Sequence, residues 1–235
     1  MTIFVGLDLS LVSPGIAIYK TMGASWSLYG FTQRVREHGF RYTKTPTLVH
    51  LFPMIPGSEK TNEARYEHIR HHIVDLVLDR LEPETGESVV VGIECYAFGA
   101  KNSGSSYKLQ ELGGVLKHAI WKRFPGWKQT IIPPSQWKKQ TLSNGRATKE
   151  DALRFVESHG PCISLLSVLG LTISKNGEIP CPAQDLADAA CIVLALNQPI
   201  PLVPSTTKKK PGKRKRTQNP VHTTLSIGNI LVSGI

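Results

Sequence analysis

The sequence has little cysteine. Its 235 residues include only four, and no two of them form a C-x-x-C pair. This irregular spacing argues against a zinc ribbon and against a fold stapled by disulfides. We therefore expect a reducing compartment and small buried thiols at Cys95, Cys162, Cys181 and Cys191.

Long hydrophobic runs are also missing. None approaches the roughly 18 residues that a membrane-spanning helix needs, and residues 191–196 have the character of a core helix. The first residues, Met1 to Phe4, lack the charged and then apolar layout of a secretory signal. We therefore expect an intracellular protein of the cytoplasm or nucleus, with no membrane partner.

Acidic residues are in the minority. The chain has 28 Lys and Arg against 18 Asp and Glu, a formal net charge of +10. Residues 208–216 hold seven cations and no acid, so subtracting these seven from +10 leaves +3 for the rest. We predict a folded domain over residues 1–198 and a disordered basic tail over 199–235. Such a run is typical of a solvated tail, of an arm that binds nucleic-acid phosphates, or of a nuclear import signal.

Short apolar runs predict the strands. Residues 3–9 and 16–19 flank a Ser-Pro-Gly turn and indicate a hairpin. A continuous apolar run indicates a strand buried on both faces. The further expected strands are 26–31, the buried run 88–94, and 130–132.

Helical periods and caps predict four helices. One begins after Thr61 and continues to Leu81, and another is capped by Thr148 with Asp151 as a capping-box acid. The other two cover 107–122 and 183–196, while 39–57, with three prolines, indicates an irregular connection. Hairpin strands followed by alternating strands and helices predict an α/β domain whose mixed five-stranded sheet is flanked by helices.

Carboxylates occupy positions where an ionised group is costly. Asp8 and Glu94 stand in strands that otherwise look buried, and a charge there costs several kcal/mol unless it is compensated. Asp185 and Asp188 are three apart and share one helix face among small apolar residues. Each acid also has an ordinary explanation, as a turn cap, a strand end or a helix N-terminal acid.

The combination indicates a metal site. Four adjacent carboxylates repel one another and require divalent cations to be stable. Oxygen ligands without His or Cys select Mg²⁺, with Mn²⁺ as a substitute. Two such ions about 4 Å apart support in-line attack of water on a phosphodiester.

Five stretches in a fixed order resemble a known family. They are GLDLS with SPG at 6–15, VGIE at 91–94, YKL with ELGGV at 107–115, PPSQWK with GRATK at 133–149, and DLADAA at 185–190. In this order they resemble the RuvC-type Holliday-junction resolvases of the ribonuclease H-like superfamily, especially members from phages and large DNA viruses. The resemblance spans residues 3–197.

This resemblance implies a ribonuclease H-like fold and specific roles for individual residues. Asp8, Glu94, Asp185 and Asp188 would bind two metal ions, and Lys149 would stand near the scissile phosphate. Lys138 would be a second phosphate contact, since a lysine neutralises charge that develops on a phosphoryl oxygen. A homodimer with two sites is implied as well, each site nicking one strand of a four-way junction.

Further DNA contacts are expected around the site. Where the family often has an aromatic wedge, this chain has Ala97 between Tyr96 and Phe98, and either ring would stack on a base or pack in the core. Glycine permits close approach to a DNA backbone, which favours Lys101 in the loop 99–106 and Arg146 beside Gly145. Lys139 joins them as a DNA contact. Residues 32–58 and 160–182 are longer than in compact bacterial members, which leaves the preferred substrate open.

Other motifs have ordinary explanations. His68, His71 and His72 have metal-ligand spacing on a helix, but the charged residues around them favour a solvated face. Trp121, Trp127 and Trp137 are expected to pack in the core or between helices.

The sequence therefore predicts a Mg²⁺-dependent, structure-selective DNA endonuclease that resolves four-way junctions by paired nicks. Two alternatives stay open. One is the same chemistry on other branched DNA, such as forks or flaps, and the other is a junction-binding protein that does not cleave.

Overall fold

The computed structural model describes residues 1–32, 39–42, 47–53, 61–94, 104–161 and 163–198. One compact unit covers Met1–Ile200. The predicted basic tail, 199–235, lies outside the described residues, as do Cys95 and Cys162.

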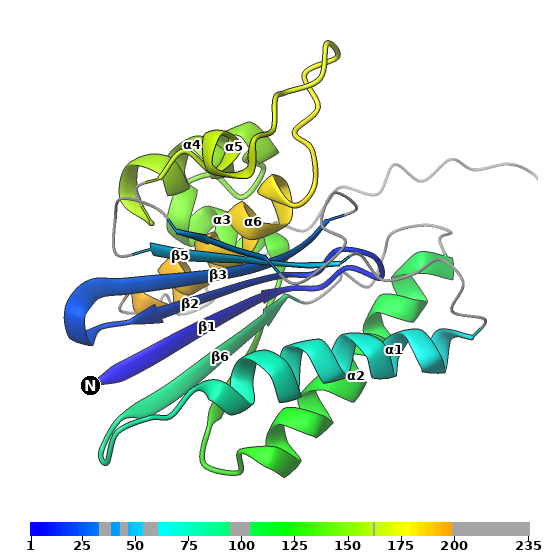
Figure 1. Cartoon of the computed structure of the whole chain (residues 1–235), viewed down its shortest axis with the longest axis vertical. Coiled ribbons are helices and arrows are strands. Elements are labelled where there is room, and N and C mark those ends of the chain that lie inside the picture. The colour runs from blue at the N-terminus through cyan, green and yellow to red at the C-terminus, as the bar shows by residue number, and fades with distance from the viewer. Residues whose placement is uncertain (33–38, 43–46, 54–60, 95–103, 162, 199–235) are drawn as a thin grey trace, which may run out of the picture. The chain divides into compact units, whose positions relative to one another are not determined.

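A mixed sheet of seven strands forms the middle layer (Figure 1). Its strand order is β4-β5-β3-β2-β1-β6-β7. β1, β2 and β3 are antiparallel, whereas β6 runs parallel to β1 and β7 parallel to β6. The bounds are β1 Thr2–Asp8, β2 Gly15–Lys20, β3 Ser25–Thr32, β4 Gly39–Tyr42, β5 Thr47–Pro53, β6 Ser88–Glu94 and β7 Lys128–Ile132.

The α/β class and the mixed sheet flanked by helices are confirmed, and the five expected strands are adjacent in the order β3-β2-β1-β6-β7, with β7 at one edge. The strand number was wrong, because residues 39–57 contain β4 and β5 instead of an irregular connection. β5 pairs parallel to β3, and its buried residues include Val49, Leu51 and Phe52. Prolines are tolerated at strand ends, and here Pro46 precedes β5 and Pro53 ends it.

Helices cover both faces of the sheet (Figure 1). One face packs against α1 (Asn62–Arg70), the π-helical segment η2 (His71–Val77), the 3₁₀ turn η3 (Leu78–Arg80) and α2 (Gly104–Arg123). The other face packs against α3 (Pro134–Leu142), α4 (Lys149–His159), α5 (Leu165–Leu169) and α6 (Ala183–Asn197).

The helix signals in the sequence are mostly confirmed. Thr61 accepts a hydrogen bond from Ala64 N, and Thr148 and Asp151 form the predicted capping box. The expected helix from Thr61 to Leu81 is regular only to Arg70 and then continues as η2 and η3. α3 and α5 were not predicted. The sequence analysis used Pro134 only as the end of a strand. In the structure α3 begins at this residue, because proline suits the first helical position.

α6 lies directly against β1 and β2 because glycines face it. A Cβ atom at Gly6 would collide with the carbonyl oxygen of Ala189, and one at Gly15 would collide with that of Asp185. The absence of these side chains lets the helix backbone touch the sheet. This contact fixes the N-terminal half of α6 beside the end of β1.

Candidate active site

Two of the predicted acids end neighbouring parallel strands. β1 and β6 are paired up to Leu7 and Ile93, and the next residues are Asp8 and Glu94. Both carboxylates are buried. Because the carboxyl ends of parallel strands meet at one edge, the register itself places these two side chains next to each other.

The other two acids come from α6. Asp185 is buried in the first turn, and Asp188 follows one turn later on the same face. The contact between Gly15 and the Asp185 carbonyl holds this turn against the sheet. The structure therefore brings together all four acids that the sequence singles out.

Burial and mutual repulsion shift the pKa values of three of these acids. Burial raises the pKa of Asp8 well above its usual range, and repulsion from Glu94, Asp188 and Asp185 raises it further. Burial and repulsion from Glu94 raise the pKa of Asp188 to about 7, against the opposing effect of Lys138. The pKa of Asp185 is also raised, mainly by burial. Ionised carboxylates at these three positions are therefore costly.

Two neutral donors orient carboxylates in the cluster. Ser13 Oγ donates to Asp185 Oδ2 at 2.6 Å, and Trp137 Nε1 donates to Glu94 Oε1 at 3.0 Å. Sequence reasoning gave neither residue this role. The one available signal was their position inside the motif stretches 13–15 and 133–138.

The chemistry of the donors fits a hard divalent cation. All four side chains offer carboxylate oxygens, and Asp188 Oδ1 is buried without a hydrogen-bond partner among the described residues. As the side chains stand, no three Asp, Glu, His or Cys residues in the described ranges form a group that could hold a metal ion. The adjacency of the four acids comes from the backbone, through the β1–β6 register and the contact of α6 with the sheet.

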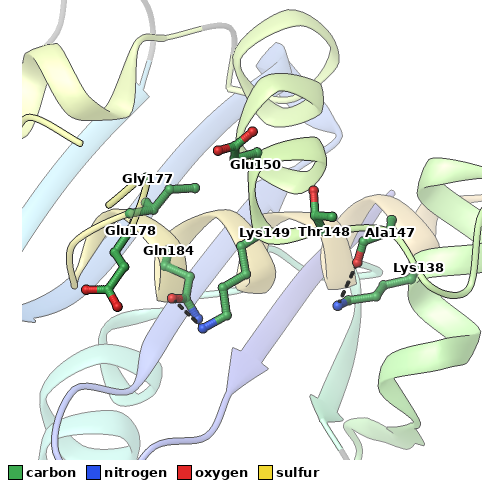
Figure 2. Close-up of a pocket in the computed structure, with 9 residues that line it drawn as sticks. Lys138, Ala147, Thr148, Lys149, Glu150, Gly177, Glu178 and Gln184 are labelled. Carbon is green, nitrogen blue, oxygen red and sulfur yellow. Dashed lines mark hydrogen bonds between the residues drawn. The ribbon is translucent and has the colours of Figure 1, made fainter. Parts of the chain in front are cut away.

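Two predicted lysines border the cluster and line a cavity of about 750 Å³ (Figure 2). Lys138 Nζ donates to the carbonyl oxygen of Ala147 at 3.1 Å, and Lys149 Nζ donates to Gln184 Oε1 at 2.7 Å. Both ammonium groups act to lower the pKa of Asp188, so both lie within electrostatic range of the acids.

The remaining predicted DNA contacts fall into two groups. Lys139 and Arg146 are exposed, Lys139 on α3 and Arg146 in the loop before α4. Tyr96, Phe98 and Lys101 lie outside the described residues.

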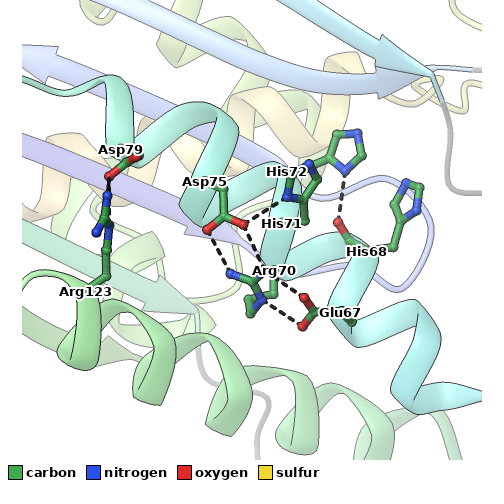
Figure 3. Close-up of polar contacts among 8 residues, drawn as sticks. All are labelled: Glu67, His68, Arg70, His71, His72, Asp75, Asp79 and Arg123. Atoms are coloured by element: carbon green, nitrogen blue, oxygen red, sulfur yellow. Dashed lines mark hydrogen bonds and ion pairs between the residues drawn. The ribbon is translucent and has the colours of Figure 1, made fainter.

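The histidines of α1 and η2 belong to a network of polar and ring contacts (Figure 3). His71 Nδ1 contacts Asp75 Oδ2 at 2.9 Å, and the rings of His68 and His72 stack 4.5 Å apart. His71 is exposed and the other two are half-buried, so the predicted solvated face holds only in part. Arg70 pairs with both Glu67 and Asp75.

The tryptophans and cysteines differ from expectation in two places. Trp137 is fully buried and Trp127 stacks on Phe124 at 3.9 Å, as predicted, whereas Trp121 is 60% exposed. Trp121 lies on the outer face of α2, with its ring 5.9 Å from that of His118. Cys191 is buried as expected, but Cys181 is exposed.

Across the described part of the chain, no helix is both long and apolar enough to cross a membrane.

Comparison with known proteins gives matches of structure and none of sequence. No protein-family model and no curated protein matches the chain. The structure of Thermus thermophilus RuvC is 18% identical, with a TM-score of 0.46 over 82% of this chain and 92% of that one. T. thermophilus RuvC in complex with a Holliday junction substrate is also 18% identical, with a TM-score of 0.48 over 83% and 92%.

A third solved structure is the yeast mitochondrial Holliday junction resolvase Ydc2. It is 8% identical, with a TM-score of 0.46 over 82% of this chain and 76% of that one. In fold, this chain thus resembles solved structures of RuvC and of Ydc2.

Proposed function

We propose that this chain is a metal-dependent, structure-selective DNA endonuclease that resolves four-way junctions by paired nicks. The observation that carries the proposal is geometric: Asp8 and Glu94 end the paired strands β1 and β6, and α6, which carries Asp185 and Asp188, lies against this sheet beside two lysines. Buried acids with raised pKa values are costly for the stability of the fold, and a bound cation would offset this cost. The four-way junction is proposed as the substrate because the ordered sequence motifs resemble those of junction resolvases.

Mg²⁺, when bound by these carboxylates, would supply an activated water and neutralise phosphate charge. The rest of the chemistry belongs to this chain's own residues. Trp137 donates to Glu94 and Ser13 donates to Asp185, so one oxygen of each of these two carboxylates has a hydrogen-bond partner. Lys149 and Lys138 place positive charge where the phosphoryl oxygens of the cleaved strand would develop negative charge.

The proposal extends to partners and location. We expect a homodimer, since paired nicks require two sites, and an intracellular location in the cytoplasm or nucleus. The folded domain, 1–198, would hold the active site, and the basic tail, 199–235, would contact DNA phosphates or act as a nuclear import signal.

A nicking assay on synthetic junctions tests the function. The wild-type chain should cut four-way junctions in Mg²⁺ and should cut forks and flaps less efficiently, while Asp8→Asn should bind junctions without cutting them. Binding without nicking by the wild type would favour a non-cleaving junction-binding protein. Faster cutting of forks or flaps would favour a different branched substrate.

A further inference from the structure

Lys149 is an exposed lysine whose ammonium group is held by a partner on another helix. It is the first residue of α4, directly after the Thr148 cap. Its Nζ donates to Gln184 Oε1 of α6 at 2.7 Å (Figure 2). A fixed lysine loses rotamer freedom, and a hydrogen bond from a charged donor is strong enough to offset this loss. The bond therefore keeps the end of the Lys149 side chain at α6.

The start of α4 is an unfavourable place for a cation. A helix N-terminus carries partial positive charge, which favours acids such as Glu150 and Asp151 and disfavours lysine. The Lys149 side chain leaves this end of α4 and reaches across to α6 (Figure 2). The stability of α4 thus gives no reason for a lysine here, whereas the acids carried by α6 do.

The position of Gln184 on α6 connects it with these acids. Gln184 directly precedes Asp185, and it shares one helix face with Asp188 because the two stand at i and i+4. The contact of Gly15 with the Asp185 carbonyl oxygen holds the same turn against the sheet. Lys149 opposes the rise in the pKa of both Asp185 and Asp188. Gln184 therefore keeps the Lys149 ammonium on the side of α6 where the acids lie.

An amide is a suitable partner for a lysine that acts on a phosphate. Gln184 is uncharged, so its hydrogen bond orients Lys149 and leaves the positive charge uncompensated. An ammonium has three N–H donors, and Lys149 uses one of them on Gln184. The other two remain for phosphoryl oxygens. A carboxylate in the place of the amide would also hold the ammonium, but it would cancel the charge.

We propose that Gln184 is a positioning residue, which holds the Lys149 ammonium beside the acids of α6 where the scissile phosphate would bind. The inference rests on the proposed function for the presence of that phosphate. Its two parts are tested separately, the hydrogen bond without DNA and the effect on the reaction with a junction.

The first measurement follows the ammonium group by NMR. The full chain is isotope-labelled at its lysine nitrogens, and exchange of the ammonium hydrogens with water is measured in EDTA at low temperature. The Lys149 signal is identified by its loss in Lys149→Met. Gln184→Met, which has a similar length and no amide oxygen, should speed this exchange severalfold at Lys149. Lys138 should be unchanged, since it donates to the Ala147 carbonyl oxygen. An unchanged rate at Lys149 would overturn the inference.

The second measurement compares the rate of cleavage at saturating junction with the affinity for the junction in EDTA. Gln184→Met should lower the rate about tenfold, the effect of losing one hydrogen bond to a charged group. It should keep the affinity, because the displaced ammonium retains its charge. In a Lys149→Met background the same change should have no further effect, since Gln184 acts through Lys149. Gln184→Glu should also lower the rate, because its carboxylate cancels the lysine charge.

Gln140→Met is the matched control. Gln140 is half-buried like Gln184, lies on α3 and lines a separate cavity, so both measurements should give wild-type values. A full loss of rate from Gln184→Met in the Lys149→Met background would show a general structural role and overturn the inference. A chain in which Gln184 holds Lys149 but which cuts no junction would refute the proposed function alone. A junction-cutting chain that is unaffected by Gln184→Met would refute the inference alone.

Discussion

The indole Nε1 of Trp137 donates a 3.0 Å hydrogen bond to Oε1 of Glu94, and both side chains are buried. The bond joins the first turns of α3 to the last residue of β6. Trp137 therefore does more than fill the core. Its one donor fixes which way a proposed metal ligand points.

Replacing Trp137 with phenylalanine keeps a buried ring and removes the donor. We expect cleavage to fall about 10- to 100-fold, the usual effect of losing a group that orients a metal ligand, and the Mg²⁺ concentration for half-maximal cleavage to rise. Trp127→Phe is the control, because Trp127 stacks on Phe124 and has no part in the proposed site. An unchanged Mg²⁺ requirement in Trp137→Phe would contradict an orienting role.

Asp8→Asn should separate stability from activity. Removing a buried charge that its neighbours repel should raise the free energy of unfolding in EDTA by about 0.5–2 kcal/mol, while cleavage is lost. Urea unfolding measures the first effect and the nicking assay the second. Asp79→Asn is the control, since Asp79 is paired with Arg123 at the surface and its loss should cost about 1 kcal/mol or less. A destabilised Asp8→Asn would show that repulsion in the cluster is not the dominant effect.

Mg²⁺ should stabilise the folded chain by mass action. A cation that binds only the native state adds about 2.7 kcal/mol to the free energy of unfolding at 100 times its dissociation constant. We expect the unfolding midpoint of the wild type to rise with Mg²⁺ and that of Asp185→Asn to rise much less. Ser13→Ala, which removes the 2.6 Å hydrogen bond to Asp185, should fall between them. Equal shifts in all three proteins would argue against Asp185 as a ligand.

Two glycines in different surroundings should respond in opposite directions to replacement by alanine. Gly6→Ala would force a Cβ into the Ala189 carbonyl, so we expect a loss of about 1–3 kcal/mol from overpacking. Gly114→Ala on α2 meets no atom within 4 Å, and alanine there should add about 0.5–1 kcal/mol because it favours the helix. Urea midpoints compare the two. A neutral Gly6→Ala would mean that α6 can shift away from the sheet.

The Arg70 network predicts a dependence on acid pH. Hydrogen bonds from Arg70 hold the pKa of Asp75 below its usual range, so the folded state favours the ionised form. This contribution is complete above the unfolded pKa of about 3.9, and it is lost as the pH falls through the lower folded value. Asp75→Asn should therefore be less stable than the wild type at pH 6, and the difference should shrink below about pH 4. A constant difference across this range would exclude the ionised Asp75 as its source.

The central strands and most helices could be predicted because their signals are local. The apolar run 88–94, the Ser-Pro-Gly turn and the Thr148 cap each act over a few residues, and all three are present in the structure. β5 was missed because three prolines outweighed its apolar residues, although pairing with β3 decides that segment. η2 was missed because a helical period does not distinguish an α-helix from a π-helix over two turns.

The residue types of the site were set by the sequence alone: four acids in costly positions and two lysines in recognisable stretches. Their adjacency was decided by the tertiary structure, through the β1–β6 register and the glycines that admit α6. The roles of Ser13 and Trp137 were decided there as well. Their hydrogen bonds join residues 172 and 43 positions apart, and contacts over such separations follow from packing and leave no periodic trace in the chain.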